Sequence, residues 1–398
     1  MILSKGKNTK NAVFSSLLRH ILSIQIYDRD AGNVFVIPIF LIFAVVFMFI
    51  IIPKKMAYHF HNLVFEGGGV KGIAYVGALE VLEKEGILQN VKRVAGTSAG
   101  AMMAVLVGLR YTADEVREIL WDLNFKKFLD SSFGIVRDTK RLIEEYGWYK
   151  GDYFRDLMAD LIKRKTGNGE MTFAQLAATQ KYREIYLVGA DLSTGVSKLF
   201  YNNKETGGMK IADAARISMS IPLFFASVKA GDDEKHIYVD GGLLDNYSIK
   251  TFDRENFVDD KKKNIRRTEY YDKVNSKKSM LQVIGDNPYI YNRETLGFRL
   301  DAKEDISMYL AQKPIVRNKI NTFFTYTKAL VTTLIDFQDS IHLHSDDWQR
   351  TVYIDTLGVR AIDFDISDVK KQKLVDSGRQ YTAEYLNWYN NEEEKANK

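Results

Sequence analysis

The chain lacks cysteine altogether among its 398 residues. Disulfide bonds, thiolate metal sites and a cysteine nucleophile are therefore excluded. Histidine is scarce too: six are present, and none has the HExxH spacing of a zinc hydrolase. His59 and His61, like His342 and His344, lie two positions apart and would share one face of a strand. We expect no metal site at either pair.

Neither sign of charge dominates the composition. The chain has 56 Lys and Arg against 51 Asp and Glu, which gives a net charge of +5. Nucleic-acid-binding proteins usually concentrate a stronger basic excess on one face, so no nucleic-acid partner is predicted. A hydrophobic share of 46% and a charged share of 27% are typical of a globular protein. The polar, basic stretch at 259–278 is expected to be a solvated surface insertion.

One long apolar run lies near the N-terminus. Residues 34–52 (VFVIPIFLIFAVVFMFIII) contain no charge, and a helix of this length spans roughly 28 Å, close to the hydrocarbon core of a bilayer. Lys54 and Lys55 follow the run and can reach the lipid head groups. The sequence therefore predicts a single-pass membrane protein with a transmembrane helix at 34–52. The tail at 1–33 has amphipathic character, and the flanking lysines favour a cytoplasmic catalytic domain.

After residue 60 the sequence alternates between short apolar runs and helical periodicity. The runs at 62–66, 91–95, 184–190 and 237–240 predict strands, and the stretches at 71–85 and 99–109 predict helices. Strands separated by helices indicate an α/β sandwich with a mostly parallel sheet. We expect this domain to cover 60–386 and to be followed by a charged C-terminal tail at 387–398.

The pentapeptide Gly96-Thr97-Ser98-Ala99-Gly100 lies between a predicted strand and a predicted helix. A nucleophile elbow requires this context, because its serine sits on a sharp strand-to-helix turn with the Oγ exposed. Small neighbours such as Gly96 and Gly100 avoid clashes in so tight a turn. The helix N-terminus adds positive partial charge that favours an oxyanion. Ser98 is therefore a candidate nucleophile.

A second glycine-rich loop precedes this elbow. Gly67, Gly68 and Gly69 are followed by Lys71 and Gly72, again between a predicted strand and a predicted helix. Successive glycines let several backbone N–H groups point at one place, as in the oxyanion hole of an acyl hydrolase. The same loop fits GxGxxG, the dinucleotide fingerprint, so both interpretations stay open for this loop alone. A Walker loop is excluded because no Lys-Ser/Thr pair follows the last glycine.

A third motif, Asp240-Gly241-Gly242, follows another predicted strand. Alone it is an ordinary Asp-Gly turn. Together, however, a GGGxKG loop, a GxSxG elbow about 30 residues later and a DGG turn about 140 residues after that resemble the patatin-like phospholipase family. The resemblance covers nearly all of 61–386, with further similar stretches at 189–195, 215–225, 294–301 and 350–367. It implies a patatin-like three-layer α/β/α sandwich.

The resemblance also implies the chemistry. It assigns a Ser–Asp dyad without a catalytic histidine, in which Ser98 is the nucleophile and Asp240 the base, and burial should raise the pKa of Asp240. The implied oxyanion hole is Gly67, Gly68 and Gly69; the implied supporting residues are Lys71, Gly72, Gly96, Gly100, Gly241 and Gly242. Neither metal nor cofactor is needed. The implied activity is hydrolysis of the fatty acyl esters of a lipid bilayer, of phospholipase A or lysophospholipase type. An activator is compatible with this activity, but nothing in the sequence identifies one.

Two alternatives remain. The first is a Ser–Asp–His esterase with the α/β-hydrolase fold, which would use His342 or His344. The second is a non-catalytic dinucleotide-binding module that uses the GxGxxG loop. His236, four residues before Asp240, is expected to be a surface histidine on a strand rather than a third member of the site.

Overall fold

The computed structural model describes residues 58–128, 144–230, 235–280, 287–301 and 346–391, with residue 142 and short stretches within 320–334. The transmembrane helix expected at 34–52 lies outside these residues, as do the tail at 1–33 and both His342 and His344. In the part of the chain that the structure describes, no helix is both long and apolar enough to cross a membrane.

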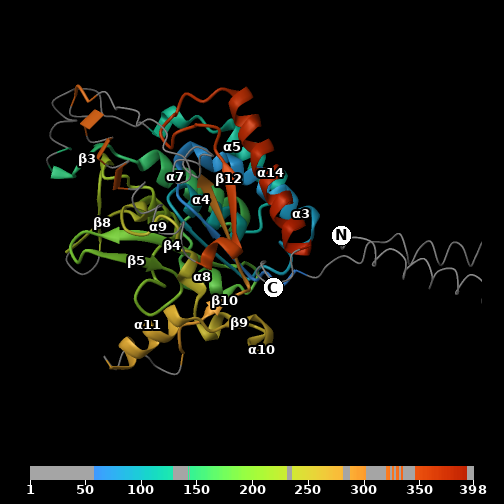
Figure 1. The fold of residues 1–398 in the computed structure, drawn as a ribbon. Coiled ribbons are helices and arrows are strands. Elements are labelled where there is room, and N and C mark those ends of the chain that lie inside the picture. The colour runs from blue at the N-terminus through green and yellow to red at the C-terminus, as the bar shows by residue number, and fades with distance from the viewer. Residues whose placement is uncertain are drawn as a thin grey trace, which may run out of the picture. The chain divides into compact units, whose positions relative to one another are not determined.

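An eight-stranded sheet forms the centre of the described fold (Figure 1). Its strand order is β12-β11-β1-β2-β4-β8-β7, with β5 also paired to β4. Strands β12, β11, β1, β2 and β4 run parallel to one another, whereas β5 and β8 are antiparallel to β4, and β7 is antiparallel to β8. The predicted α/β fold with a mostly parallel sheet is therefore confirmed. The bounds are β1 Asn62–Phe65, β2 Arg93–Thr97, β4 Glu184–Asp191, β5 Val196–Phe200, β7 Val228–Ala230, β8 His236–Asp240, β11 Thr295–Asp301 and β12 Thr351–Asp355.

Helices connect the strands. They are α3 Ala74–Lys84, α4 Ala99–Gly108, α5 Ala113–Asp122, α7 Asp152–Thr166, α8 Phe173–Ala178, α9 Ile211–Ser218, α10 Lys261–Asn264, α11 Glu269–Met280 and α14 Asp368–Asn391. The 3₁₀ turns are η1 Gly69–Ile73, η2 Phe125–Phe128, η4 Gly241–Leu243, η5 Ile249–Phe252, η6 Glu255–Phe257 and η7 Asp346–Arg350, and two small ribbons pair β3 Gly147–Tyr149 with β6 Leu223–Phe225 and β9 Ile265–Arg266 with β10 Tyr291–Asn292. Capping boxes begin α5 at Thr112 and α8 at Thr172.

The two faces of the sheet bury different partners. In β1, Leu63 and Phe65 belong to the main core with helices α3, α4 and α14, whereas Val64 points to a smaller cluster that contains Tyr247 and Phe252. Among the described residues, the second face is thus packed mainly by η5 and its neighbours rather than by long helices. This packing brings the chain after the DGG turn against the sheet.

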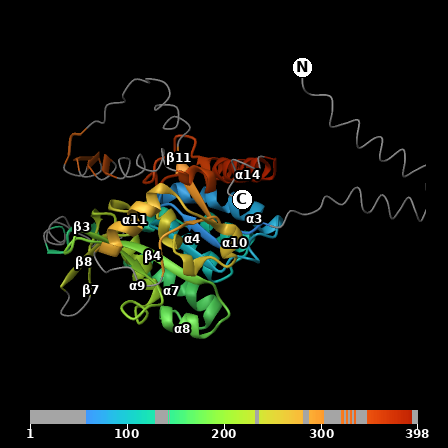
Figure 2. The same ribbon diagram turned by 60° about the horizontal axis from the view of Figure 1, so that its bottom comes forward.

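Helix α14, near the C-terminus of the chain, packs against the main core. It packs along α3, and both views show the two helices side by side (Figures 1 and 2). Glycines allow this approach: a Cβ on Gly77 would lie 1.9 Å from the Val375 carbonyl oxygen, and a Cβ on Gly378 would lie 1.9 Å from that of Ala74. Tyr389 is buried and the helix reaches Asn391, so the folded unit extends beyond the boundary expected at 386.

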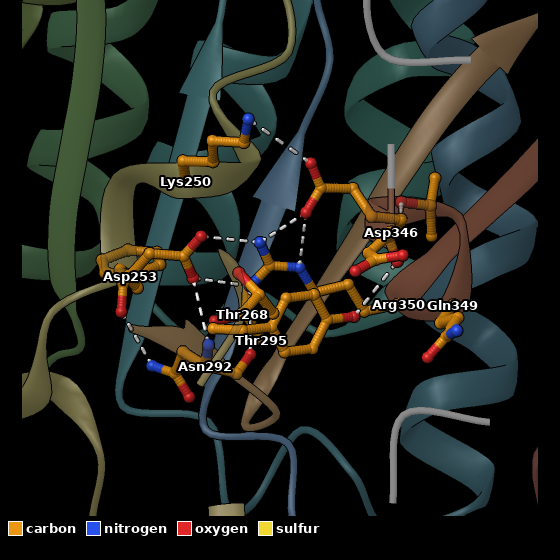
Figure 3. A network of polar contacts seen from close by, with 12 residues as sticks. Lys250, Asp253, Thr268, Asn292, Thr295, Asp346, Gln349 and Arg350 are labelled. Atoms are coloured by element: carbon orange, nitrogen blue, oxygen red, sulfur yellow. Dashed lines mark hydrogen bonds and ion pairs between the residues drawn. The ribbon is translucent and has the colours of Figure 1, made fainter. Parts of the chain in front are cut away.

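A buried ion-pair network fixes the chain beyond η5 (Figure 3). The Arg350 guanidinium has no exposed side-chain surface and binds both carboxylate oxygens of Asp253 at 2.6 and 2.7 Å, and Asp347 Oδ1 at 2.6 Å. Asn292 joins the network because its N–H donates to Asp253 Oδ1 at 3.2 Å and its carbonyl accepts from Arg350 Nη1 at 3.1 Å. Tyr271 donates to Asp253 from α11. The segment expected to be a solvated insertion is therefore anchored in the core through Tyr271, which is buried.

Candidate active site

Ser98 occupies the turn between β2 and α4 expected from the pentapeptide. Its backbone has φ 53° and ψ −121°, a conformation that side-chain-bearing residues rarely adopt and that stores strain. The Ser98 N–H donates to Ser218 Oγ at 2.9 Å, and Ser218 Oγ donates to the Val188 carbonyl at 2.6 Å. Ser218 lies on α9, so this helix and strand β4 hold the strained turn in place.

The flanking glycines of the elbow are required by close packing. A Cβ on Gly96 would lie 2.0 Å from the carbonyl oxygen of Gly100, and a Cβ on Gly100 would lie 2.2 Å from that of Phe65. No side chain fits at such distances, because real Cβ contacts with backbone atoms are longer than 3 Å. Strand β1 and the start of α4 can therefore approach closely, which brings the glycine-rich loop after β1 next to Ser98.

Asp240 ends β8 and is buried, with 3% of its surface exposed. Its Oδ1 accepts a 2.7 Å hydrogen bond from the Gly242 N–H, and its own N–H donates to the Ser220 carbonyl at 2.8 Å. Oδ2 is buried and makes no hydrogen bond to the described residues. Burial raises the pKa of Asp240 to about 7, and the Ser98 hydroxyl and the Gly242 amide oppose this rise. The Asp240 carboxyl is thus buried beside the Ser98 hydroxyl, and its Oδ2 makes no hydrogen bond to the described residues.

The glycine-rich loop is tied to the DGG turn by Asn246. The Gly67 N–H donates to the Asn246 backbone carbonyl at 3.1 Å, and the Asn246 side-chain amide donates to the Gly67 carbonyl at 3.3 Å. A Cβ on Gly67 would lie 3.1 Å from Ser98 Cβ, so the loop runs directly beside the serine. The Gly67 amide is therefore already used inside the protein, which departs from the expectation that it donates to an oxyanion with Gly68 and Gly69.

The other side of this loop is fixed by charged groups. Glu66 is buried and accepts from Arg299 Nε at 3.1 Å and from the Leu300 N–H at 2.6 Å. Lys71 donates to the Leu300 carbonyl at 3.0 Å, so its ammonium binds strand β11. Gly72 belongs to η1, and a Cβ there would meet Ala99 at 3.2 Å. Lys71 and Gly72 thus hold the loop between β11 and the start of α4.

Sequence reasoning missed Glu66, Arg299, Asn246 and Ser218. The only available signals were polar residues beside apolar runs: Glu66 ends one such run, and Arg299 interrupts the stretch ETLGFRLD at 294–301. Such residues are buried only when they are paired, but their partners lie far apart in the chain. Neither pattern indicates which partner each residue meets.

An apolar pocket lies next to Ser98. Its empty volume is about 430 Å³, and this figure includes the space at its open mouth. Met219 connects it to the serine, because Ser98 Oγ lies 3.6 Å from Met219 Sδ. The lining residues are Gly69, Val70, Gly72, Ile73, Ala99, Met102, Met103, Leu120, Leu123, Phe125, Phe128, Met219 and Phe364. Since none of the described residues in its wall is charged, the pocket suits an apolar ligand group.

The described histidines pair elsewhere. His236 Nδ1 lies 2.7 Å from Asp191 Oδ2, as expected for a histidine outside the site, and His59 Nδ1 lies 2.9 Å from the Tyr389 hydroxyl. His61 Nδ1 lies 2.9 Å from Glu294 Oε2. These contacts give His59 and His61 different partners, so the pair does not form a common site.

A cluster of His61, Asp259 and Glu294 brings its ligand atoms within 4.8 Å of one another. Lys92 already contacts the Asp259 carboxylate, and Glu294 accepts from the Asp259 N–H and, at 2.7 Å, from the Asn264 side chain. Burial raises the pKa of Glu294, but the hydrogen bond from His61 and those from the Asp259 N–H and Asn264 outweigh it and lower this pKa to about 2. The cluster is therefore a satisfied ion-pair network at the start of β1.

Comparison with known proteins supports the resemblance to a known family. Residues 63–253 match the model of the patatin-like phospholipases. This segment, just under half of the chain, contains all three motifs, so the resemblance that they predict is confirmed, and it supports lipid hydrolase activity.

Relatives extend the similarity. The uncharacterized protein YqhO of Bacillus subtilis (strain 168) is 29% identical over 333 residues, which cover 81% of this chain and 97% of YqhO. The uncharacterized protein R571 of Acanthamoeba polyphaga mimivirus is 31% identical over 204 residues, 50% of this chain and 64% of its own. Among solved structures, VipD from Legionella pneumophila has a TM-score of 0.48 at 15% identity, and the match covers 83% of this chain and 67% of VipD.

Proposed function

We propose that the chain is a serine lipid acyl hydrolase of phospholipase A or lysophospholipase type, with Ser98 as nucleophile and Asp240 as its base. The observation that carries this proposal is the pairing of a strained serine elbow with a buried carboxyl whose pKa lies near 7. A serine hydroxyl is a poor nucleophile and needs a base at hand. A general base works best when its pKa is near the working pH.

In the proposed first step, Ser98 Oγ attacks the carbonyl carbon of a fatty acyl ester. Asp240 Oδ2 takes the hydroxyl proton, since Oδ1 is engaged by the Gly242 N–H. The same carboxyl then returns the proton to the leaving alcohol oxygen, which completes the acyl-enzyme. In the second half, water attacks the acyl carbonyl and passes a proton to Asp240. Asp240 returns this proton to Ser98 Oγ as the bond between Oγ and the acyl carbon breaks and the fatty acid leaves.

The developing oxyanion would be bound by the amides of Gly68 and Gly69, because the Gly67 amide donates to Asn246. One such donor typically contributes 10²–10³-fold to kcat. The apolar pocket beside Ala99 and Met219 would hold the acyl chain and exclude water from it. Burial of a long hydrocarbon chain in this pocket makes binding more favourable in proportion to the apolar area removed from water.

A lipid surface is the proposed source of the substrate. The transmembrane helix predicted at 34–52 would keep the catalytic domain next to a bilayer and raise the effective concentration of lipid esters. The single-pass topology and the cytoplasmic placement remain predictions from the sequence. They agree with a membrane phospholipid or lysophospholipid as the substrate.

The dinucleotide alternative is disfavoured by the loop itself. The Ala361 carbonyl oxygen lies directly over Gly69, where a Cβ would be 1.9 Å from it. A pyrophosphate at this glycine would meet a negatively polarised oxygen instead of the open N–H groups that such a site needs. We therefore do not propose nucleotide binding.

The test is fatty-acid release from mixed vesicles of phospholipid and lysophospholipid, with the full chain in one detergent throughout. Wild type should release fatty acid, whereas Ser98→Ala and Asp240→Asn should lose at least about a thousandfold in rate. Ser276→Ala, an exposed serine on α11, is the matched control and should match wild type. Release that survives in Ser98→Ala, or no release by wild type, would refute the proposal.

A further inference from the structure

The connection between β12 and α14 lies beyond the residues 63–253 that match the family, yet it reaches the site. We call residues 359–366 the C-terminal strap. Val359 is buried at one end, and Ile366 packs against the main core at the other. Between them, Arg360 and Asp363 close a turn: the Arg360 N–H donates to Asp363 Oδ2 at 3.0 Å, and Arg360 Nη2 lies 2.9 Å from Asp363 Oδ1.

The strap first contacts the glycine-rich loop. The Ala361 carbonyl accepts a 3.0 Å hydrogen bond from the Val70 N–H. A Cβ on Gly69 would lie 1.9 Å from this carbonyl oxygen, and Gly69 has φ +54°. The backbone of the strap therefore fixes the orientation of the peptide between Gly69 and Val70, next to the amides proposed for the oxyanion.

The strap then contributes to the pocket. Phe364 is half-buried and lines the same cavity as Ala99 and Met219, the residues next to the nucleophile. Its ring centroid lies 6.3 Å from that of Phe224, at 58° between the planes, which holds the ring against the domain. Because the other lining residues lie within 69–219, Phe364 is the one wall residue that the strap supplies.

We propose that the C-terminal strap completes the acyl-chain site and that Phe364 determines which acyl chain fits best. This inference rests on the proposed function, since it takes the acyl chain as the ligand of the pocket. The fit of an apolar pocket changes rate by about 10–200-fold for each methylene gained or lost. The large ring of Phe364 in one wall therefore limits the length of acyl chain that the pocket accepts.

The first experiment compares kcat/KM for palmitoyl and octanoyl p-nitrophenyl esters with the full chain. Phe364→Ala opens the wall and should raise the palmitoyl-to-octanoyl ratio at least about tenfold, whereas Phe364→Trp should lower it. Val359→Ala is the matched control: it is buried in the same strap but does not line the pocket, so it should lose stability and keep the wild-type ratio.

A second readout does not need catalysis. Binding of palmitate and octanoate to Ser98→Ala, with and without Phe364→Ala, is measured by calorimetry in the same detergent. A shifted binding ratio without ester cleavage by wild type would support the strap and sink the hydrolase. Ester cleavage with an unchanged ratio in both Phe364 variants would overturn the strap and leave the hydrolase standing. Absence of fatty-acid binding together with an unchanged ratio would also overturn it.

Discussion

Asp240→Asn should stabilise the protein at alkaline pH while abolishing its activity. The pKa of Asp240 rises from an ordinary 3.8 to about 7 because the carboxyl is buried. Since the pKa is raised in the folded state, the folded protein holds a proton between about pH 4 and pH 7 that the unfolded chain releases. The contribution of this group to stability is therefore full below about pH 4 and is lost as the pH rises through about 7.

The magnitude follows from the same shift. About three pKa units at about 1.4 kcal/mol each give about 4 kcal/mol, which wild type loses between the two pH limits. Asparagine cannot ionise, so it escapes this loss, and its carbonyl still accepts from Gly242. Its new N–H₂ group takes the place of the unpartnered Oδ2 and costs about 1–3 kcal/mol when it finds no acceptor, at every pH.

The assay is urea unfolding of both proteins at about pH 4 and about pH 8, because other titrating groups such as Asp245 and Glu294 are common to both and cancel. The free energy of unfolding of Asp240→Asn minus that of wild type should be about 3–4 kcal/mol more positive at the higher pH. A difference that stays constant with pH would refute the argument, since Asp240 would then not titrate near 7.

Substitutions at three positions test the architecture of the site. Ser98→Gly should abolish activity and raise the free energy of unfolding by about 1 kcal/mol, because glycine relieves the strain at φ 53°, while Ser98→Ala should leave it unchanged. Asn246→Ala should lower kcat about a hundredfold and change KM little, because it misplaces the glycine-rich loop rather than removing substrate contacts. Arg350→Met should cost about 3–5 kcal/mol in urea unfolding, since it leaves Asp253 buried and unpaired.

Each of these has a clear contrary result. Equal stability of the glycine and alanine variants at position 98 would mean that the elbow is not strained. An Asn246→Ala enzyme that loses only substrate affinity would place this residue in binding instead of positioning. Wild-type stability of Arg350→Met would show that the network of Figure 3 contributes little to the folded state.

The sequence predicted the elements that depend on local patterns. The apolar runs placed β1 and β4 within a residue or two, and the stretch at 99–109 matched α4. The strand expected at 91–95 lies two residues later, because Gly96 and Thr97 continue the pairing of β2 with β4. The helix expected from Lys71 begins as the 3₁₀ turn η1, whose first residue is Gly69 at positive φ beneath Ala361.

The contacts that hold the site could not be predicted in the same way. Glu66 and Arg299 are separated by 233 positions, and Asn246 and Gly67 by 179. No local periodicity encodes such pairs, since they depend on the order of strands in the sheet. The hydrogen bond from the Gly67 amide to Asn246 and the position of Phe364 in the pocket wall likewise depend on residues far apart in the chain. Motif spacing indicated which residues gather, but only the folded chain shows which donors are already used.

The central claim is that Ser98 carries the acyl group during turnover. The most direct measurement is mass spectrometry of the full chain after acid quenching during hydrolysis of a phosphatidylcholine with one defined acyl chain. We predict a mass increase equal to the fatty acid minus water on the peptide that contains Ser98, and none in Ser98→Ala. An acyl group on another residue, or product formation by the Ser98→Ala chain, would contradict the account.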